Sequence, residues 1–210
     1  MQCTTGGGVR AQKKARTRAA IRAAALELFT RQGFSSTTVE QIAHASGVSH
    51  TTFFRYFTSK EQVIIGDDLR AEREATFAAI PPGLNHFDLV RRMVTGMYEL
   101  GIADEWVANY DRIALIHADP HLRYSSQVET ERIISEATEF IADYTGVPTT
   151  DLHLRAFVAA ISGVMFYIAH AEPQADHAVG MAELLEAIDL LEQGLPMPTK
   201  QGSDETHDRI

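Results

Sequence analysis

The sequence predicts an all-α protein with a small N-terminal helical domain and a larger helical domain after it. Apolar residues recur at spacings of three and four along most of the chain, which is the periodicity of helices packed on one face. Glycine and proline fall mainly between these segments, and no alternating run typical of a strand exceeds a few residues. With 210 residues, 45% of them hydrophobic, the chain can bury a substantial core.

The first helix is expected over residues 16–32. Its apolar stripe consists of Ile21, Ala25, Leu28 and Phe29. Gly33 is suited to end this helix. Residues 1–14, with three consecutive glycines and several basic side chains, are expected to form a disordered basic arm.

Two short helices are expected next. Thr37 and Glu40 have capping-box spacing, which predicts a helix from about Thr38. Gly47 then makes a tight turn, and Ser49 is placed to cap a third helix over about 50–56.

A fourth helix is expected from near Ser59 to about residue 80, where two prolines and a glycine end it, and it would link the two domains. Later helices are expected near 86–100, 104–117, 121–144, 150–171 and 176–193. Residues 195–210 have little apolar content, which predicts a disordered tail. The two folded domains are therefore expected to be 15–60 and 61–194.

The two short helices and their glycine turn have the spacing of a helix-turn-helix. Phe53 and Phe57, four residues apart, can pack together on the stripe of the first helix. The other face of the third helix then presents Ser49, His50, Thr51 and Phe54. In a major groove, histidine and threonine can bond base edges and an exposed ring can contact a thymine methyl group. Side chains expected to hold phosphates are Tyr56, Lys60 and one of the pair Thr37 and Thr38.

The charge distribution also suggests a polyanionic partner. The net charge is −9, but residues 1–60 hold nine Lys/Arg and two Asp/Glu, giving +7, while residues 61–210 hold ten and 26, giving −16. The alternative is that the basic first helix is only a solvated face. Cys3 is the only cysteine, no secretory signal is visible, and the longest nearly apolar run, 156–169, is too short to span a bilayer. These features predict a soluble, cytoplasmic protein with no membrane association.

The segment "AALELFTRQGFSSTTVEQIAHASGVSHTTFFRYFTSKEQV" resembles the N-terminal domain of TetR-family transcriptional regulators, and the likeness covers residues 19–63. The resemblance implies that Thr38, Thr52, Tyr56 and Lys60 contact phosphates. It implies that Ser49, His50, Thr51 and Phe54 face the bases. Phe54 stands where the family commonly has tyrosine, which removes a hydroxyl.

The rest of the chain resembles, more loosely, a C-terminal domain type of actinobacterial members that include mycofactocin-associated regulators. Such domains are helical, usually dimeric and often hold a small molecule. The helices near 150–171 and 176–193 carry small residues and a continuous apolar stripe, which favours a four-helix dimer interface. The alternative is that these helices only close the core of one chain.

Several residues mix apolar bulk with polar tips, as ligand cavities do and as ordinary cores also do. The candidates are Met97, Trp106, Tyr110, His117, Arg123, Tyr124 and Phe166. The resemblance to the actinobacterial members implies a small apolar or acyl-type ligand. His117 and His121 have metal-ligand spacing, but Pro120 between them disrupts the helix, so neither a metal nor a cofactor is expected. No GxSxG, HExxH, P-loop or GxGxxG pattern occurs in the sequence, so catalysis has no positive evidence and the protein is not expected to be an enzyme.

The sequence therefore predicts a ligand-responsive transcriptional regulator, a repressor in preference to an activator. It would bind a palindromic double-stranded DNA operator as a homodimer and release it when a small-molecule effector binds. Two alternatives stay open at this point. One is a non-specific nucleoid-type DNA binder, and the other is an enzyme or ligand carrier in the acidic helical domain.

Overall fold

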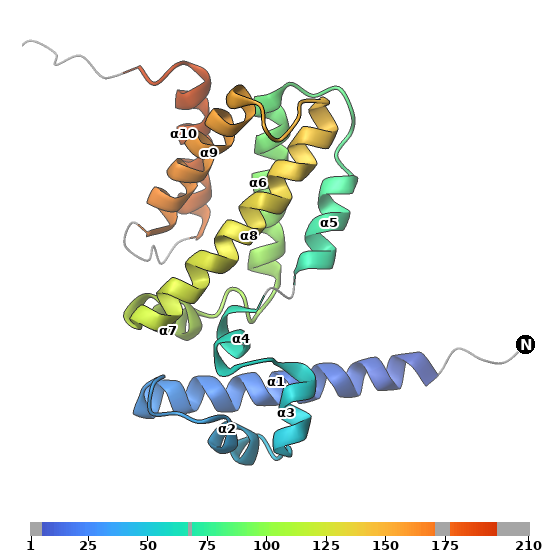
Figure 1. Cartoon of the computed structure of the whole chain (residues 1–210), viewed down its shortest axis with the longest axis vertical. Helices are drawn as coiled ribbons and strands as arrows, with labels where there is room; N and C mark the ends of the chain where they lie inside the picture. Colours follow the sequence, from blue (N-terminus) through green and yellow to red (C-terminus); the bar gives the residue numbers. More distant parts are fainter. Residues whose placement is uncertain (1–5, 67–68, 171–176, 197–210) are drawn as a thin grey trace, which may run out of the picture.

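The computed structural model describes residues 6–66, 69–170 and 177–196, and over these ranges the fold is all-α, as the sequence predicted (Figure 1). The N-terminal helices are α1 (Gly6–Gln32), α2 (Val39–Ala45), α3 (His50–Tyr56) and α4 (Lys60–Ile65). The larger bundle contains α5 (Arg70–Ala78), α6 (His86–Ala103), α7 (Tyr110–Ala118), α8 (Pro120–Thr145), α9 (Leu152–His170) and α10 (His177–Glu192). None of the helices in the described ranges is long and apolar enough to cross a membrane.

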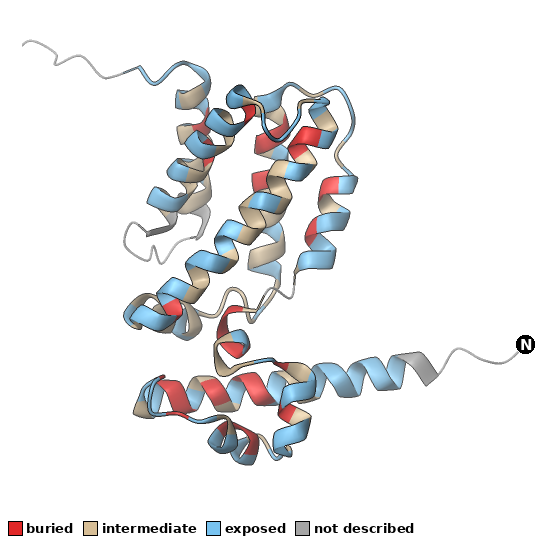
Figure 2. Cartoon of the chain, in the orientation of Figure 1, coloured by how far each residue is buried: buried red, intermediate tan, exposed pale blue. Residues whose placement is uncertain are grey.

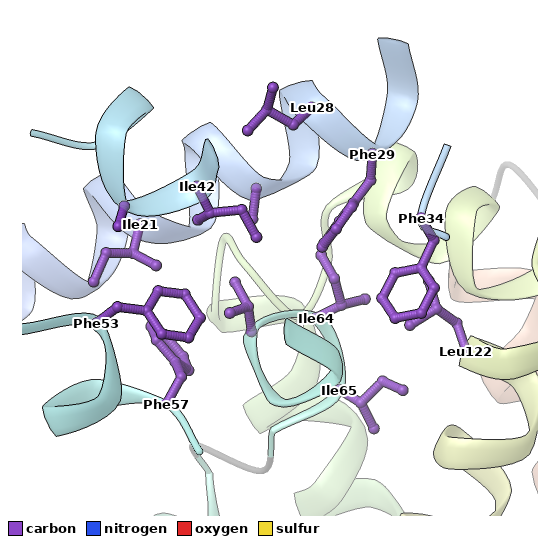
Figure 3. Close-up of a cluster of buried hydrophobic side chains, with 13 residues drawn as sticks. Ile21, Leu28, Phe29, Phe34, Ile42, Phe53, Phe57, Ile64, Ile65 and Leu122 are labelled. Carbon is purple, nitrogen blue, oxygen red and sulfur yellow. The ribbon is translucent and has the colours of Figure 1, made fainter. Parts of the chain in front are cut away.

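The N-terminal core forms around the apolar stripe of α1. Ile21 and Phe29 of this stripe are buried, and the rings of Phe53 and Phe57 pack against it from α3 and its C-cap (Figure 3). Ile42 of α2 completes the base of the core. The expected packing of Phe53 and Phe57 on the first helix is therefore present, with both rings pointing inward from one face of α3.

Local caps fix where the short helices begin. Thr38 and Gln41 form a capping box on α2, one residue later than the Thr37–Glu40 spacing suggested. The Thr37 side chain is buried instead, and its hydroxyl donates to the Gly33 carbonyl at 2.8 Å. Ser49 caps α3, as predicted, and Ser59 caps α4 by accepting from the Gln62 N–H.

The expected disordered arm is wrong for residues 6–14, because α1 begins at Gly6. After Gly8 the segment consists mainly of alanine, glutamine, lysine and arginine, which favour helix, and no proline interrupts it. Residues 1–5 of that arm lie outside the described residues, as do residues 197–210 of the expected tail.

The expected continuous helix over 59–80 is also wrong. α4 ends at Ile65, Gly66 leaves the helical conformation with ψ 133°, and the helix resumes only at Arg70. Glycine is the weakest helix former after proline, so a Gly66 followed by two aspartates favours a break here. The link between the domains therefore contains two helices, α4 and α5, in place of one.

The helix expected over 104–117 begins six residues later, at Tyr110. The Asp104 carboxylate accepts hydrogen bonds from the backbone N–H groups of Trp106 and Val107 at 2.9 and 2.8 Å, which stabilises a turn in place of the first helical residues. Asn109 then caps α7 by accepting from the Arg112 N–H at 2.8 Å.

The larger domain has its own core, built from α5, α6, α8, α9 and α10. Leu89 of α6 and Ile188 of α10 are fully buried at its centre, with Ile141 of α8 and Ile161 of α9 beside them. Figure 2 shows that buried residues lie in two groups, one in each domain. Polar contacts reinforce the bundle: Arg73 of α5 is buried and pairs with Glu136 of α8 at 2.9 Å.

The two domains meet around α4 and α8. Val63 and Ile64 of α4 belong to the N-terminal core, and so does Leu122 from the first turn of α8. The Arg112 guanidinium of α7 donates to the Ile64 carbonyl at 2.6 Å. Because α4 packs with the first core, we propose that the domain boundary follows α4 and does not fall at the expected position between residues 60 and 61.

Gly96 marks a close approach between α5 and α6. A Cβ at Gly96 would lie 2.5 Å from Thr76 Cγ2. We expect Gly96→Ala to lower the free energy of unfolding by about 1 kcal/mol. The clash destabilises the fold by about 1–3 kcal/mol, and the higher helix propensity of alanine offsets about 1 kcal/mol of that. Urea unfolding followed by circular dichroism measures this.

Thr76→Ser is the matched change, since it removes only Cγ2 and keeps the hydroxyl that donates to the Glu72 carbonyl at 2.8 Å. In the Thr76→Ser background, Gly96→Ala should become neutral or stabilising. An equal loss in both backgrounds would contradict the close approach.

Candidate nucleic-acid interface and apolar cavity

Helix α3 divides into an inward and an outward face. Phe53 and Phe57 are 0% and 3% exposed, while Phe54 between them is 45% exposed. His50 and Thr51 are exposed on the same side as the Phe54 ring. The division that the sequence predicted for α3 is therefore present, with an apolar ring, an imidazole and a hydroxyl on its free edge.

Two contacts orient His50. Its Nε2 lies 3.3 Å from a carboxylate oxygen of Glu40, on α2, and its ring meets Phe54 edge to face with centroids 4.8 Å apart. Hydrogen bonds from its own backbone N–H and from the Thr38 hydroxyl lower the pKa of the Glu40 carboxyl, with a smaller contribution from His50. Glu40 is thus an ionised partner for His50 on the outward surface. The sequence suggested only a capping role for Glu40, because contacts between α2 and α3 depend on the turn geometry.

Ser49 and Thr52 are occupied by helix capping. The Ser49 hydroxyl accepts from the Thr52 N–H at 3.1 Å and donates to the Thr52 hydroxyl at 2.9 Å. Ser49 is exposed and Thr52 is half-buried. Of the four residues expected to face bases, His50, Thr51 and Phe54 form the outward edge, while Ser49 fixes where that edge begins.

Two expected phosphate contacts lie on either side of this edge. Thr38 is exposed at the start of α2, where its side chain also serves the capping box. Tyr56 is half-buried at the end of α3, with the Arg55 guanidinium 5.5 Å from its ring centroid. Arg18 of α1 donates to the Tyr56 carbonyl at 3.2 Å, which ties the end of α3 to α1.

Lys60 has a structural position that the sequence did not suggest. Its ammonium donates to the carbonyls of Phe34 and Thr37 at 2.8 and 2.9 Å and lies 4.2 Å from the centroid of the Phe34 ring. Two of the three N–H donors of the Lys60 ammonium therefore bind carbonyls of the α1–α2 loop. One donor is left for the expected phosphate contact.

An apolar cavity of about 300 Å³ lies between α6, α8 and α9. Two of the expected ligand residues, Met97 and Phe166, line it. The other lining residues are Val90, Met93, Val94, Thr130, Ile133, Ile134, Ala137, Ile141, Phe157, Val158, Ile161, Ser162 and Met165. Thr130 and Ser162 are the only polar side chains among them, and none is charged, so the cavity suits a hydrocarbon group.

The other five expected ligand residues do not line this cavity. Tyr110, Arg123 and Tyr124 are exposed, and His117 is half-buried on α7. These residues lie at the end of the bundle near the N-terminal domain, where α7 meets the start of α8 (Figure 1). Mixed polar and apolar composition does not reveal which helix faces enclose a space, so the sequence alone could not place these residues relative to the cavity.

Trp106 belongs to the junction between the domains. It packs against the N-terminal core, and the guanidinium of the buried Arg22 lies 4.8 Å from its ring centroid. The Arg112 guanidinium lies 5.7 Å from the same ring centroid. Trp106 therefore connects the loop before α7 to α1.

In the described part of the chain, no three His, Cys, Asp or Glu side chains gather as a metal ion would need.

Family models match both parts of the chain. The model for bacterial regulatory proteins of the tetR family matches residues 21–65, and the model for the MftR C-terminal domain matches residues 84–196. The chain is 34% identical over 164 residues to the HTH-type transcriptional regulator TcmR of Streptomyces glaucescens, covering 74% of this chain and 72% of TcmR. It is 26% identical over 174 residues to the regulator MftR of Mycobacterium tuberculosis, covering 81% of this chain and 87% of MftR.

Solved structures share the fold. The fatty acid degradation regulator FadR from Bacillus halodurans aligns with a TM-score of 0.54 at 18% identity, covering 87% of this chain and 97% of that chain. A TetR-like transcriptional regulator from Rhodococcus sp. RHA1 aligns with a TM-score of 0.51 at 18% identity, covering 85% and 96%.

The position of Lys60 leads to a stability prediction. Lys60→Met keeps an unbranched apolar stem but removes the ammonium, so two carbonyls of the α1–α2 loop lose a charged donor. We expect the free energy of unfolding to fall by about 1–3 kcal/mol. Lys14→Met, at an exposed position of α1, is the control and should leave stability unchanged. Urea titration distinguishes the two. Wild-type stability for Lys60→Met would mean that the two carbonyl contacts contribute nothing to folding.

Proposed function

The chain belongs to the TetR family of bacterial transcriptional regulators, and we propose that it is a ligand-responsive repressor that binds a palindromic operator as a homodimer. Its relatives are DNA-binding regulators and not enzymes, in agreement with the sequence-based prediction. The observation that carries the proposal is the free edge of α3, where Phe54, His50 and Thr51 are exposed because Phe53 and Phe57 hold the helix from the other side.

In this proposal, α3 enters the major groove and its free edge reads the bases. His50 and Thr51 offer hydrogen-bonding groups to base edges, and the Phe54 ring offers apolar contact to a thymine methyl group. Thr38, Thr52 and Tyr56 border this edge and would contact phosphates, with Lys60 contributing through its remaining donor. A homodimer would place two copies of α3 in successive major grooves, roughly 34–36 Å apart or a multiple of that distance.

The surface of α9 supports dimerisation. Ala159, Ala160, Gly163 and Tyr167 lie on one exposed face of this helix, and Tyr167 is 75% exposed. Small residues allow another helix to approach closely, and a large exposed ring beside them is unusual for a surface that stays in water. We therefore keep the expected interface, which pairs α9 and α10 with their copies in a four-helix arrangement.

The apolar cavity is the proposed effector site. A ligand with a hydrocarbon or acyl portion would place that portion among Val94, Ile134 and Ile161, and any charged group would remain outside because no lining residue is charged. α8 lines the cavity with Ile133 and Ile134 and reaches the N-terminal core with Leu122. A shift of α8 on ligand binding would therefore reach α4 directly, and ligand and DNA would weaken each other by reciprocal coupling.

Selection of bound DNA from a random pool, followed by titration of the selected site, tests the function. A regulator should bind the selected palindrome about 10³-fold or more tightly than random DNA at physiological salt. Equal binding to both would favour the nucleoid-type alternative, and it would contradict the proposal.

His50 provides a residue-level prediction. His50→Ala should lower the preference for the selected site by about 5- to 150-fold, which corresponds to about 1–3 kcal/mol for one base contact, and should leave binding to random DNA unchanged. His121→Ala, an exposed histidine at the start of α8, is the control and should change neither. If His50→Ala weakens both kinds of binding equally, His50 does not face a base. Fluorescence anisotropy with labelled duplexes measures both affinities.

Filling the cavity tests the effector site. The neutral fluorophore N-phenyl-1-naphthylamine should bind the wild-type chain at one saturable site, and decanol should displace it. Ala137→Trp places a large ring in the cavity and should abolish this binding, whereas Glu139→Trp, on an exposed part of the same helix, should not. Equal fluorophore binding by both variants would show that the cavity is not the site.

A further inference from the structure

The first half of α1 extends beyond the N-terminal core. Residues 8–16 are exposed without exception, although they are helical, and the helix continues past α3 in Figure 1 and is exposed throughout this stretch in Figure 2. Most helices in proteins owe their stability to packing on one face. Residues 8–16, which we call the α1 arm, therefore lack the usual reason to be helical.

The charge of the α1 arm makes its helical conformation still less favourable in isolation. Its cations are Arg10, Lys13, Lys14 and Arg16, and the first acidic residue of the chain is Glu27. Arg10 lies three and four residues before Lys13 and Lys14, so like charges are neighbours on the helix surface. A polyanion beside the arm would remove this penalty.

The structure shows where such a polyanion would lie. The α1 arm and α3 form the two walls of an open groove of about 370 Å³. Arg10, Lys13 and Lys14 line the wall from α1, and Arg55 lines the wall from α3. The other lining residues are Thr17, Gly47, Val48, Ser49, Thr52 and Tyr56. The lining thus contains four cations, three aliphatic hydroxyls, a phenol and no acidic side chain.

We propose that this groove holds the sugar–phosphate backbone beside each half-site, so that the α1 arm is a second DNA contact outside the major groove. The inference rests on the proposed function, because it places the duplex next to α3. A backbone strand would face cations on both walls, and the Thr52 hydroxyl and the Tyr56 phenol would donate to its phosphates. Since these contacts touch no base, they add affinity and salt dependence without sequence preference. An apolar membrane surface fits less well, because Val9 is the only large apolar side chain exposed on the arm.

The test compares two variants of the full-length protein with the same change in net charge. Lys13→Gln/Lys14→Gln removes two charges from the groove, and Arg92→Glu makes the same change at an exposed position of α6. For the double variant, the slope of log Kd against log salt should fall by about 1.8, so that the affinity loss between 50 and 200 mM salt becomes about tenfold smaller than for wild type. Arg92→Glu should keep the wild-type slope. The preference for the selected site over random DNA should be unchanged in both.

A footprint gives an independent measurement. Hydroxyl radicals should show protected sugars flanking each half-site with the wild-type chain and with Lys13→Arg/Lys14→Arg, and lose that flanking protection with Lys13→Gln/Lys14→Gln. An unchanged slope and footprint in the glutamine variant, or an equal fall of the slope in Arg92→Glu, would overturn the inference while leaving the regulator intact. Failure of the wild-type chain to prefer any selected site would overturn the proposed function as well.

Discussion

The outward edge of α3 depends on how the rings of Phe53 and Phe57 are buried. A helix of seven residues has no stability of its own in water, so packing must hold it. Both rings fit against the α1 stripe, and at a spacing of four residues they fix the rotation of α3 about its axis. The Ser49 cap fixes where the helix starts, and Arg18 fixes its end through the Tyr56 carbonyl. Exposure of His50, Thr51 and Phe54 follows from these constraints.

Side-chain contacts also hold the other short elements of the N-terminal domain in place. The loop between α1 and α2 carries few apolar residues, and Lys60 holds it by bonding two of its carbonyls. α4 then contributes Val63 and Ile64 to the first core and is attached to α7 through Arg112. The short helices therefore form one unit with the base of the larger bundle. In this arrangement α8 lines the apolar cavity and also contributes Leu122 to the N-terminal core, so it connects the two directly.

The sequence was most informative where one residue type determines the local outcome. The spacing of Phe53 and Phe57, the Ser49 cap and the Gly47 turn are local features, and the structure agrees with the elements that they predicted. The predicted continuous helix over 59–80 was wrong because it contains a residue that is compatible with two local structures. Gly66 could be tolerated inside a helix or end it, and here it ends α4.

The contacts that individual side chains make were harder to predict from the sequence than the positions of the helices. Lys60 could reach solvent or the loop carbonyls, and only the three-dimensional course of the α1–α2 loop decides between them. The cavity was also beyond the sequence, because Ile134 and Val158 look like any core residues until the faces of α8 and α9 are known. Trp106 was assigned to a ligand site because of its composition, but its neighbours come from the first 60 residues and from α7.

The location of Trp106 has an experimental consequence. It is the only tryptophan in the chain, and the guanidinium of Arg22, which comes from the other domain, lies 4.8 Å from its ring centroid. Indole emission responds to the charge and polarity beside the ring, so the intrinsic fluorescence of the unlabelled protein reports on this junction, where Arg22 and Arg112 both lie near the ring. The single tryptophan is thus a natural optical probe of the junction between the two domains. Movements of the domains that are too small to change the helix content would still alter its emission spectrum.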